Sequence, residues 1–135
     1  MDRLAGLLER DLSQAERLIS PEFVAHAAPL TGVGPSEIHG RDGINGWITG
    51  AHAVMPGLHF EVQVGPFVDG EFVLGRWRAR GTFLGMPGTP QDGPGRAVDF
   101  TGTDTLRVVD GVIVEYWANA DSLLFMQQIG ALPQA

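Results

Sequence analysis

An aspartate at the end of a strand-like segment is the first residue in this sequence whose position could support chemistry. Asp121 follows the β-branched, apolar run 112–119 and precedes a short helical segment that ends at Gly130. A carboxylate at such a junction can act as a general acid or base when apolar surroundings raise its pKa. The same position suits a helix N-cap, which typically stabilises a helix by about 1 kcal/mol. The sequence leaves both roles open for Asp121.

Residues near this aspartate could form one wall of a site. Trp117 and Asn119 alternate with Asp121, so a regular strand would place all three side chains on one face. Arg107 belongs to the preceding strand-like run, where it could stabilise an enolate or the aspartate itself. Two structural roles compete with these: Trp117 as part of the core or pocket wall, and Arg107 as the ion-pair partner of Glu115.

Histidines add one candidate for proton transfer and no metal site. His26 lies in an apolar segment, where it could be a second proton carrier or a structural residue at the edge of the core. His39 and His52 have no carboxylate or histidine at metal-ligand spacing. We therefore expect no metal.

Composition limits the class of protein. The 135 residues are 44% hydrophobic and 19% charged, which predicts one folded domain over residues 1–135. Zero cysteines exclude disulfides and thiolate catalysis, and a net charge of -7 argues against binding nucleic acid. No apolar run is long enough to cross a membrane, and the N-terminus lacks a signal-peptide core. We expect a cytoplasmic protein.

Two Asp-Gly dipeptides define the strands that would position the candidate residues. Asp110-Gly111 separates segments 97–109 and 112–119, which predicts an antiparallel hairpin closed by a type I′ turn. Asp69-Gly70 likewise predicts a turn between an alternating strand that begins at Leu58 and a strand over Phe72–Phe83. The chain therefore becomes β-rich in its second half.

The first half is predicted to be helical. Residues 1–19 suit two short helices, and Ser20-Pro21-Glu22 resembles another helix start. Asp42 could cap a helix whose apolar face is Ile44, Trp47, Ile48 and Ala51. Three glycines, Gly43, Gly46 and Gly50, would weaken this helix by up to about 1 kcal/mol each. Close packing of helix on sheet is the favoured reason for them, and room for a ligand is the alternative.

Arginines and a glycine-rich loop in the second half indicate which kinds of substrate and cofactor the chain could bind. Three arginines, Arg76, Arg78 and Arg80, share one face of a strand, which indicates salt bridges or, alternatively, a basic wall for an anionic substrate. The loop 85–95 is long enough to border a site, but neither a phosphate-binding loop nor a dinucleotide motif is present. We therefore expect no nucleotide cofactor.

The order of elements predicts an α+β fold. N-terminal helices would pack on a strongly curved antiparallel sheet, followed by a short C-terminal helix. Such a sheet forms a cone whose mouth can hold a small molecule.

Most of the chain carries segments similar to one family, namely Ser20–His26, Pro56–Phe60, Gly75–Trp77, Gly81–Gly85, Thr105–Trp117, Asp121 and Gln128–Gly130. These segments resemble the SnoaL-like polyketide cyclases, or ester cyclases, of the nuclear-transport-factor-2-like (NTF2-like, cystatin-like) superfamily. The segment Thr105–Trp117 is the most specific of them.

The resemblance implies a cofactor-independent intramolecular aldol cyclisation of a polyketide-type ester in secondary metabolism. It places Asp121 as the general acid/base, with Arg107 and His26 in support. A hydrophobic substrate would bind against aromatic and polar side chains from helix and sheet, namely Trp117, Asn119, Trp77, Trp47 and Phe83. Phe83 stands where many relatives carry histidine. The resemblance also implies a homodimer or higher homo-oligomer formed through the outer face of the sheet.

Other functions stay open on the same fold. An epoxide hydrolase needs an Asp-Arg-Asp arrangement, whereas Arg76 is followed two residues later by Arg78. An isomerase of the ketosteroid type needs a tyrosine beside a protonated aspartate, and the only tyrosine, Tyr116, would face away from Asp121. A non-catalytic module for small-molecule binding or dimerisation is the remaining alternative.

Overall fold

The computed structural model describes residues 18–29, 36–85, 93 and 95–132. Its elements follow the chain in the order β1 (Ile19–Ala27), β2 (Glu37–His39), α3 (Gly40–Val54), β3 (His59–Asp69), β4 (Phe72–Phe83), β5 (Arg96–Val109), β6 (Val112–Ala120) and α4 (Ser122–Gln128). The helices predicted before residue 18 and most of the predicted loop 85–95 lie outside the described residues.

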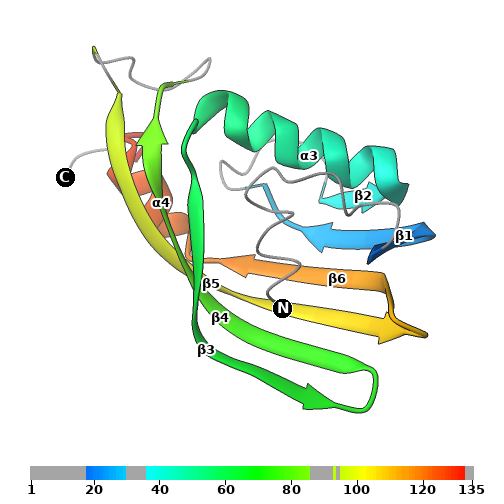
Figure 1. Ribbon diagram of the computed structural model, residues 1–135. Helices are drawn as coiled ribbons and strands as arrows, with labels where there is room; N and C mark the ends of the chain where they lie inside the picture. Colours follow the sequence, from blue (N-terminus) through cyan, green and yellow to red (C-terminus); the bar gives the residue numbers. More distant parts are fainter. Residues whose placement is uncertain (1–17, 30–35, 86–92, 94, 133–135) are drawn as a thin grey trace.

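The strands form a single curved sheet in the order β2-β1-β6-β5-β4-β3. All neighbouring pairs are antiparallel except β1 and β6, which run parallel. Strands β3, β4 and β5 bend strongly along their length, and helices α3 and α4 cover the concave side (Figure 1). The predicted α+β fold with a strongly curved sheet is confirmed.

Both predicted hairpins are present. Asp110 and Gly111 have φ values of 52° and 79°, as the two central residues of a type I′ turn require. The other turn lies one residue later than predicted, because Asp69 pairs with Phe72 and leaves Gly70 and Glu71 in the loop. Gly70, with φ of 60°, takes the first central position, where a type II′ turn needs glycine.

Strand β1 corrects the prediction of a helix start at Ser20-Pro21-Glu22. These residues lie in an extended strand, at a break in its register with β6 between Ile19 and Val24. Proline cannot donate a ladder hydrogen bond and is tolerated in strands at such irregularities. Pro21 and Glu22 are exposed there, while Phe23 and Ala25 return to the core.

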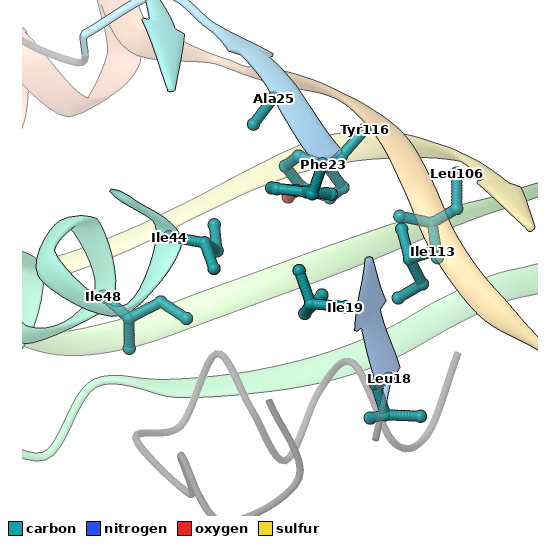
Figure 2. Packing of buried hydrophobic residues seen from close by; sticks show 9 residues of the cluster. All are labelled: Leu18, Ile19, Phe23, Ala25, Ile44, Ile48, Leu106, Ile113 and Tyr116. Atoms are coloured by element: carbon teal, nitrogen blue, oxygen red, sulfur yellow. The ribbon is translucent and has the colours of Figure 1, made fainter. Parts of the chain in front are cut away.

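Helix α3 begins two residues before the predicted cap. His39 occupies the N-cap position, and Asp42 lies in the first turn, where its charge complements the helix dipole. Ile44 and Ile48 are buried as the periodicity predicted. They contact a cluster from β1, β5 and β6 that includes Phe23, Leu106 and Tyr116 (Figure 2). Burial of each large apolar side chain contributes about 1.5–3 kcal/mol, which fixes the helix on the sheet.

Helix α4 closes the other end of the concave side. Phe125 and Ile129 are fully buried in a second cluster with residues of β4 and β5. Gly130 has φ of 73°, and the amides of Gly130 and Ala131 donate to the carbonyls of Gln127 and Met126. This is a Schellman ending, so the predicted helix stop at Gly130 is confirmed.

Among the described residues, no helix combines the length and apolar character needed to cross a lipid bilayer.

Candidate active site

A cavity of about 350 Å³ lies between α3, α4 and the concave side of the sheet. Its volume falls within the usual range for small-molecule sites, about 300–1,000 Å³. Among the described residues, the lining contains no ionisable side chain other than a tyrosine, and it is rich in aromatic residues: Trp47, Phe60, Trp77, Phe83, Phe100, Tyr116 and Phe125. The structure therefore places three of the residues expected to bind substrate, Trp47, Trp77 and Phe83, in one apolar pocket.

Asp104 is the acidic residue that belongs to this side of the sheet. It lies on β5 between Gly102 and Leu106, and only 1% of its surface is exposed. Burial raises the pKa of Asp104 to about 6, because an apolar environment disfavours the charged form. A carboxyl group with this pKa is mostly ionised at neutral pH and still accepts a proton readily.

Two polar groups of the pocket wall accompany this carboxyl group. The Trp77 indole N–H and the Tyr116 hydroxyl lie close enough to Asp104 to offset part of the rise in its pKa. Neither carboxylate oxygen completes a hydrogen bond of normal geometry, and Trp77 Nε1 also has no hydrogen-bond partner within the described part of the chain. Buried polar atoms are rarely left in this state, so hydrogen-bonding capacity is available here for another group.

Tyr116 is kept protonated by the same surroundings. Burial raises its pKa well above the ordinary value, and the charge of Asp104 raises it further. Its ring also packs edge-on against Trp47 of α3, with 6.4 Å between centroids. Tyr116 is therefore a fixed hydrogen-bond donor and not an acid that gives up its proton.

A small side chain brings Asp104 within reach of the cavity. Asp104 is directly opposite Ala118 in the ladder between β5 and β6, and Ala118 lines the cavity. Side chains opposite each other in an antiparallel pair have Cβ atoms about 4.5–5.5 Å apart. A ligand seated on Ala118 would therefore lie beside the Asp104 carboxyl group.

Gly102 determines how the Trp77 ring lies over β5. A Cβ atom added at Gly102 would come within 2.3 Å of Trp77 Cζ2 and 2.6 Å of the Asn119 carbonyl oxygen. We expect Gly102→Ala to lower the free energy of unfolding by about 1–3 kcal/mol, because backbone and ring must both move. Chemical denaturation would measure it, with Gly46→Ala as a control that meets no atom within 4 Å. Equal stability of Gly102→Ala and the unaltered protein would contradict the close contact of Gly102 with the Trp77 ring and the Asn119 carbonyl group.

Asp121 occupies the predicted helix N-cap position but not the expected cavity. Its side chain is 51% exposed, makes no capping hydrogen bond, and accepts one from the Thr101 hydroxyl. Arg76 lies 3.9 Å away on the same convex face. The expectation of an acidic side chain at Asp121 within an apolar cavity is wrong.

Trp117 and Asn119 share this convex face and are not part of the cavity lining. The residues of β6 that line the cavity are Tyr116, Ala118 and Ala120. The Trp117 ring instead stacks on His26, with 5.5 Å between ring centroids. The prediction that Trp117, Asn119 and Asp121 share a face is thus consistent with the structure, but it is the opposite face from the pocket.

Arg107 and His26 also lie away from the cavity and from Asp121. Arg107 is opposite Glu115 in the ladder, yet its Nε donates to Glu71 at 2.8 Å. Glu115 instead accepts from His26 Nε2 at 2.7 Å, in the tautomer that donates from this nitrogen. The structure does not bring Asp121, Arg107 and His26 together.

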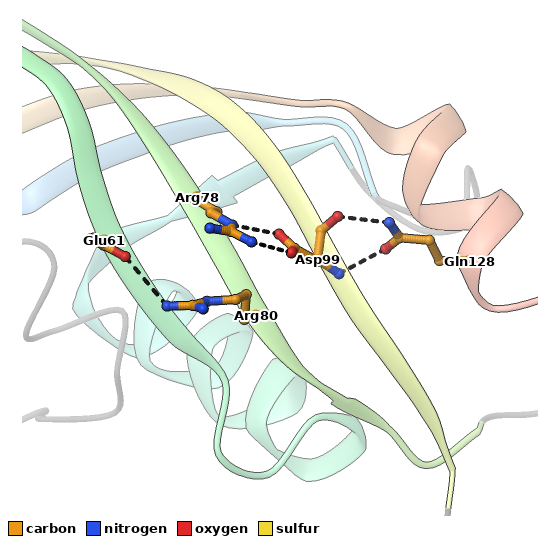
Figure 3. Close-up of polar contacts among 5 residues, drawn as sticks. All are labelled: Glu61, Arg78, Arg80, Asp99 and Gln128. Atoms are coloured by element: carbon orange, nitrogen blue, oxygen red, sulfur yellow. Dashed lines mark hydrogen bonds and ion pairs between the residues drawn. The ribbon is translucent and has the colours of Figure 1, made fainter.

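The three arginines of β4 form salt bridges and polar contacts on the convex face. Arg78 pairs with Asp99 of β5, and Arg80 reaches Glu61 of β3 (Figure 3). The Gln128 side-chain amide bonds both backbone groups of Asp99, at 2.8 and 2.7 Å, which anchors α4 to the sheet. These arginines therefore do not line the cavity.

Comparison with known proteins agrees with this architecture. A family model described as SnoaL-like polyketide cyclase matches residues 2–129. The chain belongs to the SnoaL-like polyketide cyclase family. A search among curated proteins gave no match.

Solved structures of SnoaL-like proteins have the same fold. IdmH from Streptomyces antibioticus, a proposed polyketide cyclase, is 32% identical with a TM-score of 0.78, over 96% of both chains. A proposed cyclase from Bacillus cereus is 23% identical with a TM-score of 0.77, over 97% of this chain and 78% of that one. AclR from Streptomyces galilaeus, a proposed hydroxylase, is 23% identical with a TM-score of 0.74, over 96% of this chain and 90% of that one. Membership of the SnoaL-like family indicates that this chain is a small-molecule enzyme.

Sequence reasoning missed the acidic residue that this SnoaL-like chain buries. Asp104 belongs to an alternating row on β5 that is otherwise apolar or glycine: Val98, Phe100, Gly102 and Leu106. A carboxylate in such a row is costly to bury without a function or a partner. The single charged residue in this otherwise apolar alternation is the sequence pattern that could have identified Asp104. Groups of three or more potential metal ligands do not occur among the described residues.

Proposed function

We propose that this SnoaL-like protein catalyses general acid/base chemistry on an apolar small molecule, with Asp104 as the catalytic base. The reaction that fits best is the intramolecular aldol cyclisation of a polyketide-type ester. The observation that carries the proposal is a carboxyl group with a pKa of about 6 beside an apolar cavity, next to a protonated tyrosine.

The steps follow from the positions of these groups. Asp104 takes a proton from the activated carbon, and negative charge moves to the adjacent carbonyl oxygen as an enolate. Once Asp104 has taken the proton, the Tyr116 hydroxyl and the Trp77 N–H no longer face a charged carboxylate, and they are suited to donate hydrogen bonds to that oxygen instead. The carbanion carbon then attacks a second carbonyl group of the same molecule. Asp104 returns its proton to the new alkoxide, so one C–H bond and the π bond of the attacked carbonyl group are replaced by a C–C bond and an O–H bond.

No electron acceptor or donor enters this balance, so the proposed reaction needs no cofactor. Residues on the convex face, including Asp121, have no role in it. The predicted homodimer stays a prediction, and the exposed Phe72 and Leu74 mark a part of the sheet that a second copy could cover.

The neighbouring tyrosine favours a second candidate, an isomerase that moves a proton within one substrate. Such enzymes take the proton with a carboxylate base and hold the resulting enolate with a tyrosine hydroxyl in an apolar site. Tyr116 faces away from Asp121 as the sequence predicted, and it faces Asp104 instead. The isomerase shares the proton abstraction with the cyclase and differs in lacking a second carbonyl group to attack.

Exchange of hydrogen for deuterium tests the shared first step. The probe is methyl naphthoylacetate, an apolar aromatic keto ester with an activated methylene group, followed by proton NMR in deuterated water. We expect the enzyme-catalysed rate to rise with pH through an apparent pKa of about 6 and then level, because the ionised Asp104 is the base. A rate equal to the uncatalysed exchange, or one that falls across this range, would contradict the proposal.

A further inference from the structure

Helix α3 presents two glycines to the cavity, beside the side chains of Trp47, Ile48, Ala51 and Val54. Gly46 and Gly50 both line the cavity, and an added Cβ atom at either position would meet no atom of the described residues within 4 Å. Gly43 differs, because its added Cβ would lie 3.0 Å from Ile38 Cγ2. Close packing between helix and strand therefore accounts for Gly43 and does not account for Gly46 or Gly50.

The two glycines are one turn apart on the same line of the helix. Residues four apart lie on one helix face and are separated by about 6 Å along the axis. Val54 continues this line toward the end of the helix and also contacts the cavity. The side-chain-free strip, defined as Gly46 and Gly50, is thus followed by a larger residue. It leaves a stretch of bare helix backbone about 6 Å long.

Glycine lowers the stability of a helix interior, and packing against neighbouring residues does not compensate for this loss at Gly46 or Gly50. Both glycines are exposed, which places the strip at the open side of the cavity. The wall formed by the sheet is aromatic, with Phe60 and Phe100 packed edge-on against Trp77 at centroid distances of 5.2 and 5.8 Å. The strip, bordered by Trp47 and Ala51 of the same helix, therefore faces an aromatic wall formed by the sheet.

We propose that Gly46 and Gly50 determine the size of the substrate, admitting a broad, flat, uncharged ring system between the α3 backbone and the aromatic wall. The described part of the lining carries no acidic or basic side chain, which favours an uncharged ligand, since burial of an unpaired charge is costly. This inference rests on the proposed function, because it concerns the same cavity. It predicts that a side chain added to the strip weakens the binding of wide ligands more than the binding of narrow ones.

Binding of two uncharged probes tests the strip without any turnover. Hydroxyanthraquinone supplies three fused rings and p-cresol supplies one, and quenching of tryptophan fluorescence reports both because Trp47 and Trp77 line the cavity. For Gly50→Leu we expect the Kd of hydroxyanthraquinone to rise at least tenfold, with a change of less than threefold for p-cresol. Gly46→Ala should weaken hydroxyanthraquinone in the same direction and by less.

Ala53→Leu is the matched control, since it adds a side chain at an exposed α3 position outside the cavity lining. Both Kd values should stay within twofold of the unaltered protein. The melting temperature of Gly50→Leu should equal or exceed that of the unaltered protein, because leucine favours the helix.

The outcomes separate this inference from the proposed function. Unaltered binding of hydroxyanthraquinone by Gly50→Leu, or an equal loss for both probes, would overturn the role of the strip while leaving the cavity as a binding site. Failure of the unaltered protein to bind either probe would overturn the proposed site and this inference together.

Discussion

Replacing Asp104 by asparagine is expected to lower kcat for deuterium exchange into methyl naphthoylacetate by about 100- to 10,000-fold, the usual contribution of a general base. The amide keeps the size of the carboxyl group and cannot accept the proton. Hydroxyanthraquinone should bind to the variant with a Kd within threefold of the unaltered protein, because the cavity walls are unchanged. Separation of turnover from binding identifies an acid/base residue rather than a structural one.

Two further Asp→Asn variants make this comparison decisive. Asp110→Asn changes an exposed residue of a type I′ turn, where asparagine is equally suited, so it should retain full activity. Asp121→Asn tests the residue that the sequence predicted as the base. Loss of turnover in Asp121→Asn with activity retained in Asp104→Asn would overturn the assignment of the base made from the structure.

The elements that frame this site could be predicted because their signals are local. Asp110-Gly111 specifies a turn from two adjacent residues, and Gly130 marks a helix end through a positive φ that glycine tolerates. The sequence also predicted the buried positions Ile44 and Ile48 on α3, since helical periodicity needs only a short window. Fold class followed from the order of such elements.

The face of each β6 side chain could not be predicted in this way. Val108 pairs with Ile113 and Arg107 with Glu115, so one extra residue, Val114, is inserted in β6. Regular alternation from the buried Ile113 would have turned Trp117, Asn119 and Asp121 inward. The bulge reverses the alternation and turns Tyr116 inward instead, beside Asp104. A single inserted residue thus moved the predicted site to the wrong side of the sheet.

The pocket residues contributed by distant elements depended on tertiary contacts. Trp77 is positioned over Gly102 on the neighbouring strand, and this contact exists only in the paired sheet. Likewise, the sequence identified the α3 glycines but not which of them pack on a strand and which line a cavity. Side-chain chemistry was visible in the sequence, whereas the spatial arrangement of these residues was not.

The stability of the same Asp104→Asn variant, relative to the unaltered protein, is expected to be higher at neutral pH than in acid. The pKa of Asp104 is raised from 3.8 to about 6 on folding, so the folded protein binds more protons than the unfolded chain between these values. Stability of the unaltered protein therefore falls as pH rises through this window and is level above it. A pKa difference of this size corresponds to about 3 kcal/mol.

Asparagine carries no charge at any of these pH values, so the stability of the variant does not fall in this way as the pH rises. Any effect of the buried amide itself is independent of pH, and the informative quantity is how the stability difference changes. We expect the free energy of unfolding of Asp104→Asn, relative to the unaltered protein, to increase by up to about 3 kcal/mol between about pH 4 and pH 7. Urea denaturation at several pH values measures it, with Asp110→Asn as the exposed control. A difference that stays constant with pH would mean that the Asp104 carboxyl group titrates alike in the folded and unfolded chains, and the base proposed here would lose the raised pKa on which its role depends.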